Sequence, residues 1–214
     1  MASFLFTRKA AFTWRAGQFL RYTLPHPHPD ERKTTRCFTI ASAPFEQRVM
    51  LTTRFAPERG SSFKRALREL PLGTMVEVVG PSGDFVVESP EVDHVFIAGG
   101  IGITPYRAIL LDLDHREQPV NVTLLYANRS PDVVYQGELE ALAATHPRLT
   151  IHSVVAPAEI TEQVTRTVIP DPSRPMFYVS GPEPLVDAVG QMVAAMGIPA
   201  AHVKQDFFPG YVWP

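Results

Sequence analysis

The sequence predicts two domains of different architecture, an antiparallel β-barrel over residues 1–90 and a doubly wound parallel α/β sheet over residues 91–214. Two patterns carry this prediction. Up to about residue 88, short segments alternate apolar and polar residues, which is typical of half-buried antiparallel strands. From residue 94 onward, apolar strands alternate with amphipathic helices, which is typical of a parallel sheet covered on both faces.

Barrel strands are expected at residues 18–24, 37–41, 49–54 and 75–79. A helix is expected between the last two strands, because apolar residues recur there at helical spacing up to Leu70 and either Ser61 or Ser62 can cap its start. The serine hydroxyls and the basic residues of this helix suit a phosphate group, although an ordinary cap explains the same residues.

In the second domain, strands are expected near residues 94–98, 121–127, 150–155 and 176–180, and helices near 104–114, 136–145, 161–168 and 184–196. The join near residues 89–91 is too short for a long tether. The two domains are therefore expected to pack firmly along a shared cleft, in which ligands meet.

A glycine-rich turn joins the first strand and helix of this second domain. Gly99, Gly100 and Gly102 remove side chains that would hold a phosphate away from backbone N–H groups. Thr104 is a good N-cap and Pro105 a good first helical residue. The pattern predicts a dinucleotide site, but the usual fingerprint has glycine in place of Pro105, so a turn without a ligand stays open at this point.

Composition limits the classes of function. The chain has 214 residues, a formal charge of −2 and one cysteine, Cys37. This charge gives no general attraction to nucleic acid or to anionic membranes. A single cysteine excludes, within this sequence, an intrachain disulfide and an iron–sulfur cluster held by cysteines. No apolar stretch is long enough to span a membrane and no signal peptide is evident, so a cytoplasmic monomer is expected.

Three other patterns are interpreted as structural. His26 and His28 lie in a proline-rich loop without a third ligand, so no metal site is expected. The carboxylates of the predicted helices have the spacing of solvated surfaces. The segment around Ser180 does not match a nucleophile elbow.

Six segments, taken in their order along the chain, resemble motifs of the ferredoxin–NADP reductase family of flavoprotein oxidoreductases. They are residues 36–39 (Arg-Cys-Phe-Thr) for the Arg-x-Tyr-Ser flavin motif, 60–62 for the flavin-phosphate loop, 80–85 for the barrel-closing turn, 99–105 for the nicotinamide-nucleotide loop, 180–182 for the Cys-Gly-Pro turn, and 206–208 for the C-terminal acid and aromatic. The resemblance extends over nearly the whole chain. It implies that the barrel binds FAD, with FMN less favoured, and that the second domain binds NADPH or NADH.

On the flavin side, the resemblance implies that Arg36 neutralises the flavin phosphate, that Phe38 lies against the isoalloxazine or the ribityl chain, and that Thr39 forms a hydrogen bond near flavin N5. Phe208 would cover the other flavin face until nicotinamide displaces it. The implied flavin contacts are Arg36, Cys37, Phe38, Thr39, Thr53, Gly60, Ser61, Ser62 and Phe208.

On the nicotinamide side, the implied contacts are Gly99, Gly100, Gly102, Thr104, Pro105, Asn128, Arg129, Tyr135, Ser180, Gly181 and Pro182. The residues implied at the reacting centre are Thr39, Ser180, Asp206 and Phe208. After the second strand the sequence has Arg129 and no acid, which slightly favours NADPH over NADH, because arginine can accept a 2′-phosphate. Tyr135 is expected to border the adenosine ribose.

The sequence departs from the family pattern in several places. Phe38 replaces a tyrosine and Thr39 a serine, which keeps stacking and a hydroxyl but loses a phenol hydrogen bond. Ser180 replaces the cysteine near the nicotinamide, which puts the rate of hydride transfer in doubt. Only residues 4–6 and their neighbours are available for a first barrel strand, so whether a barrel edge is left open is not decided at this point.

The leading hypothesis is a reductase that transfers hydride from NAD(P)H to bound FAD and passes the electrons singly to a separate carrier such as ferredoxin or flavodoxin. A free-flavin, ferric-chelate or quinone reductase would use the same hydride step. A non-catalytic flavin-binding subunit would keep the fold without turnover. The acceptor cannot be named from the sequence, because docking surfaces carry no motif.

Overall fold

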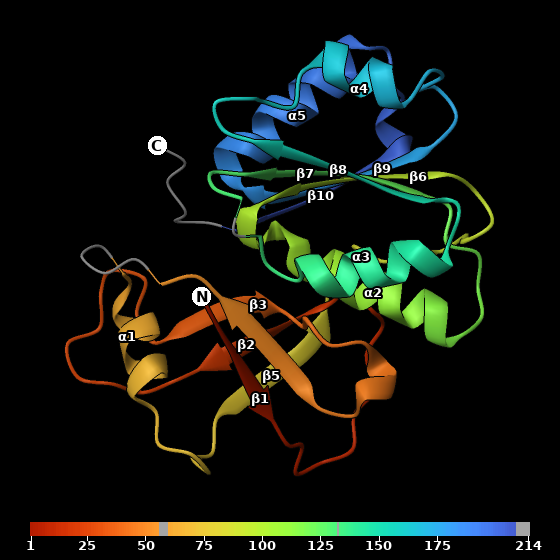
Figure 1. Ribbon diagram of the computed structural model, residues 1–214. Coiled ribbons are helices and arrows are strands. Elements are labelled where there is room, and N and C mark those ends of the chain that lie inside the picture. The colour runs from red at the N-terminus through yellow and green to blue at the C-terminus, as the bar shows by residue number, and fades with distance from the viewer. Residues whose placement is uncertain (56–59, 132, 209–214) are drawn as a thin grey trace.

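The computed structural model describes residues 1–55, 60–131 and 133–208 of the chain. Antiparallel strands and one helix form the part drawn below in Figure 1, and a parallel sheet covered by helices forms the part above. In these described ranges, no helix is long and apolar enough to cross a membrane.

The antiparallel part contains β1 (Ala2–Phe6), β2 (Phe19–Thr23), β3 (Thr35–Thr39), β4 (Val49–Thr53) and β5 (Glu77–Ser82). The strands β2 to β5 confirm the segments predicted from alternation. Residues 2–6 also form a strand, which pairs antiparallel with β4. The described strands make two hydrogen-bonded sheets, β1-β4 and β3-β2-β5, and no ladder joins one sheet to the other. The antiparallel domain is therefore two sheets around a shared core.

Helix α1 (Ser62–Glu69) closes this core. It begins after Ser61, whose hydroxyl accepts a hydrogen bond from Lys64 N at 3.3 Å, so the predicted serine cap is confirmed. The helix buries Phe63 and Leu67 on one face, among apolar residues of the strands. This packing fixes β3, the strand that carries residues 36–39.

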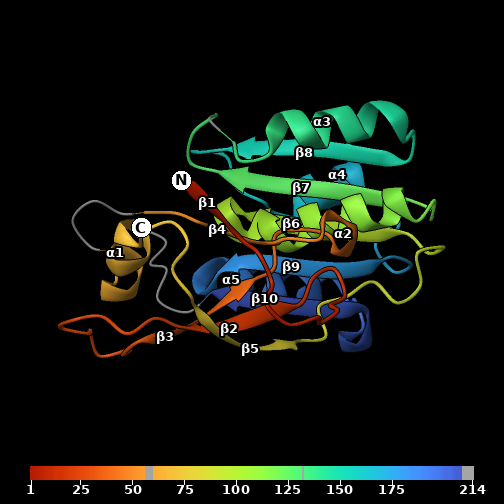
Figure 2. The ribbon, with the colours of Figure 1, turned by 90° about the horizontal axis from the view of Figure 1, so that it is seen from below.

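The parallel sheet contains β6 (His94–Gly99), β7 (Val122–Asn128), β8 (Leu149–Val155), β9 (Met176–Pro182) and β10 (Val203–Phe208). Their order is β10-β9-β6-β7-β8, with every described pair parallel, as Figure 2 shows. Four of these strands confirm the prediction. The fifth, β10, was not expected as a strand, although its residues include the predicted acid and aromatic.

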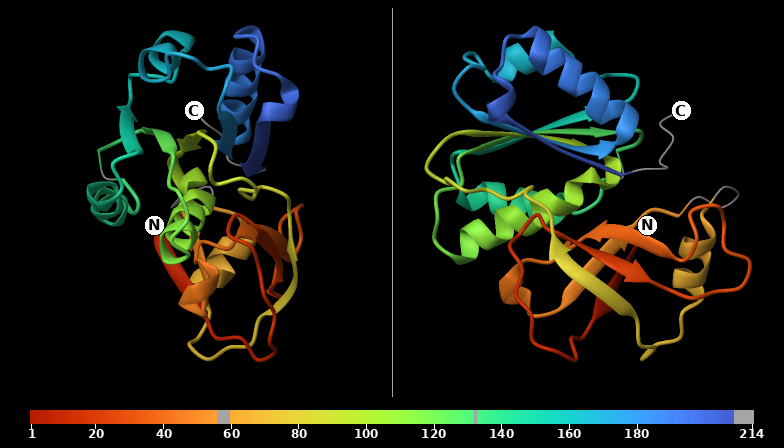
Figure 3. Two further views of the ribbon diagram at one scale, coloured as in Figure 1. Left: turned by 90° about the vertical axis from the view of Figure 1, so that its right-hand side faces the viewer. Right: turned by 180° about the vertical axis from the view of Figure 1, so that it is seen from behind.

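Helices cover both faces of this sheet, as the doubly wound prediction requires. They are α2 (Thr104–His115), α3 (Gln136–Thr145), α4 (Glu162–Val168) and α5 (Glu183–Ala195). Helices α2 and α3 lie on the face turned towards the antiparallel strands, and α4 and α5 lie on the opposite face (Figures 1 and 3). Two separate apolar clusters follow this division, one with residues of α2 and α3 and one with residues of α5.

Hydrogen bonds cross directly between the two parts of the molecule. The Tyr178 hydroxyl donates to Val86 O at 3.1 Å. Lys204 Nζ donates to Asp84 O and to Val86 O, each at 2.9 Å. These contacts hold β9 and β10 against the segment that follows β5.

Candidate active site between the two sheets

The glycine turn after β6 is shaped by main-chain contacts. It forms a short 3-10 helix, η2 (Gly100–Ile103), that leads directly into α2. A Cβ at Gly102 would lie 2.2 Å from Ser180 O, so only glycine lets the turn lie against β9. Gly100 has a φ of +52°, and a Cβ there would meet nothing within 4 Å. The turn therefore presents main chain to open space at Gly100, where a phosphate group could approach it closely.

The start of α2 differs from the expectation drawn from the sequence. Thr104 is the first helical residue, and Ile103 holds the N-cap position without a side-chain cap. The Thr104 hydroxyl donates to Ile101 O at 3.2 Å, and the Thr104 N–H also bonds Ile101 O. The predicted threonine cap is therefore wrong, because the 3-10 turn continues into the helix and uses these groups itself. Pro105 does lie in the first turn.

Three buried polar atoms on β3, β7 and β9 have no hydrogen-bond partner among the described residues. They are Thr39 Oγ1, Asn128 Nδ2 and Ser180 Oγ. Thr39 is 4 % exposed, Asn128 7 % and Ser180 0 %. Thr39 ends β3 and Asn128 ends β7, whereas Ser180 lies in β9. Leaving such an atom unpaired costs about 1–3 kcal/mol, so a ligand that supplies the missing partners fits these positions. All three residues belong to the predicted cofactor contacts.

Strand β10 brings an acid next to one of these atoms. Asp206 is the register partner of Ser180. Burial, and after it the negative charge of Asp84, raises the pKa of Asp206 to about 6. Cys37 on β3 is exposed, yet partial desolvation raises the pKa of its thiol; the charge of Arg21 opposes this rise and the charge of Asp206 adds to it. Strands β3, β9 and β10 therefore meet around one region.

Other predicted residues lie at the edges of this region. Phe208, two residues after Asp206, is the register partner of Pro182, and Gly181 pairs with Phe207. Thr53 ends β4 and is fully buried.

Arg36 and Phe38 share one face of β3, as the alternation predicts. The Arg36 Cζ atom and the Phe38 ring centroid each lie 5.7 Å from the centroid of the Phe63 ring of α1. Arg36 is not a solvated edge charge, because its side chain is 5 % exposed. Its Nη1 donates to three carbonyls of the chain just before it, and its Nη2 donates to Asp30 Oδ1 at 2.6 Å.

The same carboxylate reaches the start of α1. Asp30 Oδ2 accepts a hydrogen bond from Ser62 N at 2.8 Å, and Ser62 Oγ accepts one from Asp30 N at 2.9 Å. His26 bonds Ser62 Oγ through Nε2 and Leu24 O through Nδ1, so both ring nitrogens have partners within the chain. Gly60 lies just before the start of α1, and residues 56–59 lie outside the described ranges.

The described ranges contain no group of three His, Cys, Asp or Glu side chains that could hold a metal ion.

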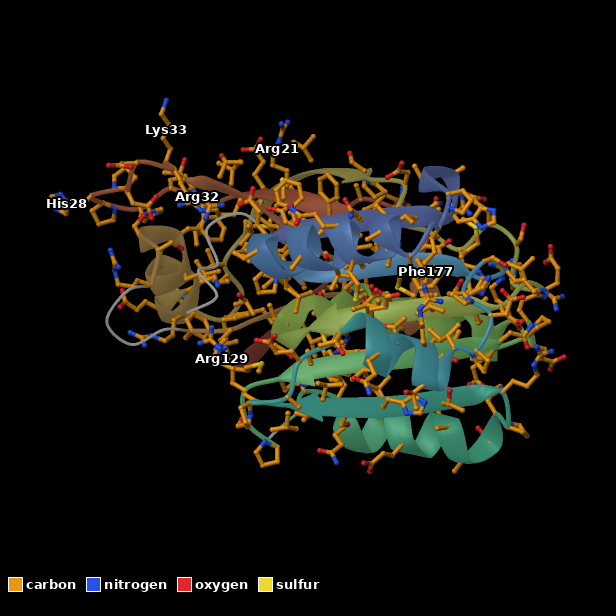
Figure 4. The ribbon with its side chains drawn as sticks, turned by 90° about the horizontal axis from the view of Figure 1, so that it is seen from above. Arg21, His28, Arg32, Lys33, Arg129 and Phe177 are labelled. Carbon is orange, nitrogen blue, oxygen red and sulfur yellow. The ribbon has the colours of Figure 1, made fainter. Side chains whose placement is uncertain are left out.

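Two residues expected at the nicotinamide nucleotide have different surroundings. Tyr135 lies in the seam between the two parts, with its hydroxyl donating to Thr52 Oγ1 at 2.5 Å and its ring 5.2 Å from Arg107 Cζ. Arg129 is exposed just after β7 (Figure 4). Burial, and after it the charge of Arg54, lowers the pKa of Arg129, so two cations are close together at this rim.

Sequence reasoning missed two residues that organise this region, Arg107 and Asp30. Arg107 Nη1 donates to Ala41 O and to Glu46 Oε2, both at 2.8 Å, and its Nη2 donates to Glu138 Oε1 at 2.6 Å. A signal was present for Arg107, because it lies three residues before Leu110 on the apolar face of a predicted helix. No such signal marked Asp30, which lies in an ordinary polar loop.

Comparisons with known proteins agree with this arrangement. A protein-family description, the oxidoreductase NAD-binding domain, matches residues 96–191. The ferredoxin reductase component of 3-ketosteroid-9-alpha-monooxygenase from Mycobacterium tuberculosis is 31% identical over 197 residues, which are 90% of this chain and 54% of that protein. The reductase component DmpP of phenol 2-monooxygenase from Pseudomonas sp. strain CF600 is 30% identical over 189 residues, 82% of this chain and 52% of the relative. The chain thus spans about half the length of these curated relatives.

Solved structures share the fold at lower identity. The Amycolatopsis cytochrome P450 reductase GcoB has a TM-score of 0.81 at 20% identity, over 96% of this chain and 64% of that one. The ferredoxin–NADP+ reductase of Plasmodium falciparum has a TM-score of 0.72 at 17% identity, over 92% of this chain and 84% of that one. The shared architecture pairs antiparallel strands with a parallel sheet.

Proposed function

We propose that the chain is a reductase module of the ferredoxin–NADP reductase family, which takes hydride from NADPH or NADH into bound FAD and passes the electrons to a separate acceptor. The observation that carries the proposal is a set of buried polar atoms, of Thr39, Asn128 and Ser180, that have no hydrogen-bond partner in the part of the chain that the structure describes. They lie on strands of the β3-β2-β5 sheet and of the parallel sheet, and two cofactors that react with one another would have to meet between these sheets.

Each of the two parts of the chain would bind one of the two cofactors. We propose that residues 1–90 hold the flavin through Arg36, Phe38, Thr39, the 60–62 segment and Phe208. Residues 91–214 would hold the nicotinamide nucleotide on the open main chain at Gly100, with Asn128 and Arg129 at the rim. An arginine directly after β7 supports NADPH over NADH, because an arginine can accept a 2′-phosphate.

The side chains have a positioning task. A bound flavin would supply the chemistry that this chain lacks, since it accepts a hydride as an electron pair and releases electrons one at a time. The Thr39 and Ser180 hydroxyls, from two different sheets, would fix the two ring systems in reacting orientation. Burial raises the pKa of Asp206 to about 6, so its carboxyl, beside Ser180 in the sheet, takes up or releases a proton in mildly acidic solution.

The acceptor we propose is a small acidic carrier protein, a ferredoxin or flavodoxin. Arg21, Arg32 and Lys33 extend from β2 and the β2–β3 loop into solvent, as Figure 4 shows, and such a basic rim would attract an acidic partner. The names of the relatives, as reductase components of monooxygenases, support a protein acceptor. We propose a cytoplasmic monomer, since the nicotinamide donors are cytoplasmic metabolites.

The test is an anaerobic titration of the purified protein with NADPH and with NADH, read at the flavin absorbance. We expect bleaching by either donor, with half-saturation at a lower concentration of NADPH. A protein that stays colourless after incubation with FAD and with FMN would refute the proposal.

A second function, reduction and release of free flavin, is favoured by one observation. Arg36 and Ser62, the residues proposed to hold the flavin phosphate, are already bonded to Asp30. A loosely held flavin would behave as a substrate. Faster NADPH oxidation with excess free flavin than with a carrier protein would favour this version.

A further inference from the structure

The carboxylate of Asp30 bridges two groups that the preceding proposal assigns to the flavin phosphate. Its Oδ1 accepts from Arg36 Nη2 at 2.6 Å, and its Oδ2 accepts from Ser62 N at 2.8 Å. Arg36 comes from β3 and Ser62 is the first residue of α1, so the carboxylate joins a strand to a helix N-terminus. One carboxylate oxygen thus accepts from a guanidinium and the other from the first amide of a helix, and both donors favour an anion.

This arrangement is what a phosphate group would use. A guanidinium and the first amide of a helix are a common pair of donors for a phosphate oxygen. Arg36 is buried, and its Nε has no hydrogen-bond partner among the described residues, so the site keeps an unused donor beside the occupied ones. A buried cation with a spare donor indicates a site built for an anion larger than one carboxylate.

Asp30 stays charged under ordinary conditions. Burial raises its pKa, but hydrogen bonds from Ser62 and Arg36 outweigh burial and lower the pKa to about 2. Protonation therefore cannot free the site at physiological pH. An incoming anion has to displace the carboxylate.

We propose that Asp30 is a specificity-determining residue for the flavin, an internal anion that occupies the phosphate position, so that flavins bearing a phosphate bind only by displacing it. The inference rests on the proposed function for the identity of the ligand. It predicts that the native protein discriminates little between riboflavin, FMN and FAD, because the phosphate contacts are offset by the lost contacts of Asp30.

Displacement of Asp30 requires the loop that carries it to move away from this position. His28 and Lys33 have φ values of 52° and 58°, in the left-handed region that non-glycine residues rarely adopt. Each such residue costs about 1 kcal/mol or more, so contacts such as those of Asp30 hold the loop in shape. Side chains of Lys33 and His28 extend into solvent (Figure 4), which leaves the loop space to shift outward.

The experiment compares three flavins on four proteins. Dissociation constants for riboflavin, FMN and FAD are measured by flavin fluorescence on the wild-type apoprotein and on the variants Asp30→Asn, Asp30→Ser and Glu31→Gln. Asparagine keeps the shape and one acceptor for Ser62 N, serine keeps a short acceptor, and Glu31 is an exposed acid of the same loop that controls for net charge. Inorganic pyrophosphate is added to each protein in a separate thermal-shift series.

We expect both Asp30 variants to bind FMN and FAD at least about tenfold more tightly, which corresponds to about 1.4 kcal/mol. Riboflavin affinity should stay within about twofold, and Glu31→Gln should match the wild type in every arm. Pyrophosphate should raise the melting temperature of the Asp30 variants by more than that of the wild type.

The proposal is overturned if Asp30→Asn and Asp30→Ser bind FMN and FAD less tightly while riboflavin is unaffected, because Asp30 would then position Arg36 for the phosphate. An unchanged ratio between phosphorylated flavins and riboflavin in a folded variant overturns it as well. If no protein binds any flavin, the proposed function fails, and the pyrophosphate series alone decides whether Asp30 guards an anion site. If one variant does not fold, the other carries the comparison.

Discussion

Arg107 of α2 and Glu46 of the 3-10 helix η1 (Pro44–Glu46) form a bidentate ion pair across the two parts of the molecule, with Nη1–Oε2 at 2.8 Å and Nη2–Oε1 at 3.0 Å. The Arg107 side chain is 8 % exposed, and it also bonds Ala41 O, two residues after Thr39. Burial lowers the pKa of Arg107, and the hydrogen bonds that it donates to Glu46 and Glu138 raise it by more, so it remains a cation. The pair therefore connects the helix that follows the glycine turn to the end of the flavin motif.

Replacing Arg107 by methionine should lower the free energy of unfolding by about 3 kcal/mol, because two carboxylates and a buried carbonyl lose their partner. Urea unfolding gives the value. Arg116→Met is the matched control: Arg116 caps the same helix, but its pair with Asp112 is exposed and should contribute less than about 1 kcal/mol. Equal losses in the two variants would contradict a special role for the buried pair.

Gly102→Ala should disrupt the turn, because the new Cβ would lie 2.2 Å from a main-chain oxygen of β9. We expect loss of nicotinamide-nucleotide binding, together with a destabilisation of several kcal/mol. Gly137→Ala in α3 serves as the control, since its Cβ would meet nothing within 4 Å and alanine favours a helix by roughly 0.5–1 kcal/mol. Calorimetric titration with NADPH and thermal unfolding measure the two effects. Native-like nucleotide binding by Gly102→Ala would show that the turn can move away from β9.

Asp206 should make stability depend on pH between about 4 and 6. Its folded pKa of about 6 lies above the ordinary aspartate value of 3.8, so the folded protein binds the proton more tightly than the unfolded chain. The contribution of Asp206 to the free energy of unfolding is therefore fully present below about pH 4, and it is lost as the pH rises through 6. Asp206→Asn should be more stable than the wild type at pH 7.5 by up to about 3 kcal/mol, at 1.36 kcal/mol per pKa unit.

Urea unfolding at pH 4.5 and pH 7.5 tests this prediction about Asp206. Asp187→Asn, which removes an exposed acid of α5, controls for net charge and should show little difference between the two pH values. A gain in stability by Asp206→Asn that is equal at both pH values would contradict the raised pKa.

Thr39→Val should leave the apoprotein as stable as the wild type or slightly more stable, because the lost hydroxyl has no partner among the described residues. The same change should slow flavin reduction by NADPH roughly tenfold or more, because one positioning hydrogen bond is lost. Stopped-flow absorbance and thermal unfolding separate the two readouts. Ser42→Ala is the contrasting variant: Ser42 Oγ bridges Arg48 O and Met50 N, so its loss should destabilise by about 1–2 kcal/mol. Stability lost in Thr39→Val to the same extent would refute the unpaired state of its hydroxyl.

Local patterns predicted most of the secondary structure, because alternation and helical spacing depend on neighbours in sequence. The strand Val203–Phe208 escaped prediction because it is short and lies at the sheet edge, where half-burial leaves no long apolar run. The glycine turn was placed correctly, but its cap was not, because Thr104 satisfies Ile101 O within a turn whose 3-10 geometry has no sequence signal.

Contacts between distant segments account for what the sequence could not show. Asp30 meets Ser62 across 32 residues, and Arg107 meets Glu46 across 61, and neither pairing has a local pattern. Tyr135 bonds Thr52 across 83 residues in the seam, and its predicted place at a ribose stays a prediction. The roles of the cofactor residues remain predictions that the experiments above can test.

If a bound cofactor supplies the partner that the Ser180 hydroxyl lacks among the described residues, the lifetime of the polypeptide depends on the supply of that cofactor. A chain whose buried groups find partners only in a bound molecule is stabilised in proportion to the logarithm of that molecule's concentration. Copies made when flavin and nicotinamide are scarce would unfold more often and be degraded sooner. The abundance of this protein would then follow the vitamin status of the cell without a dedicated regulator.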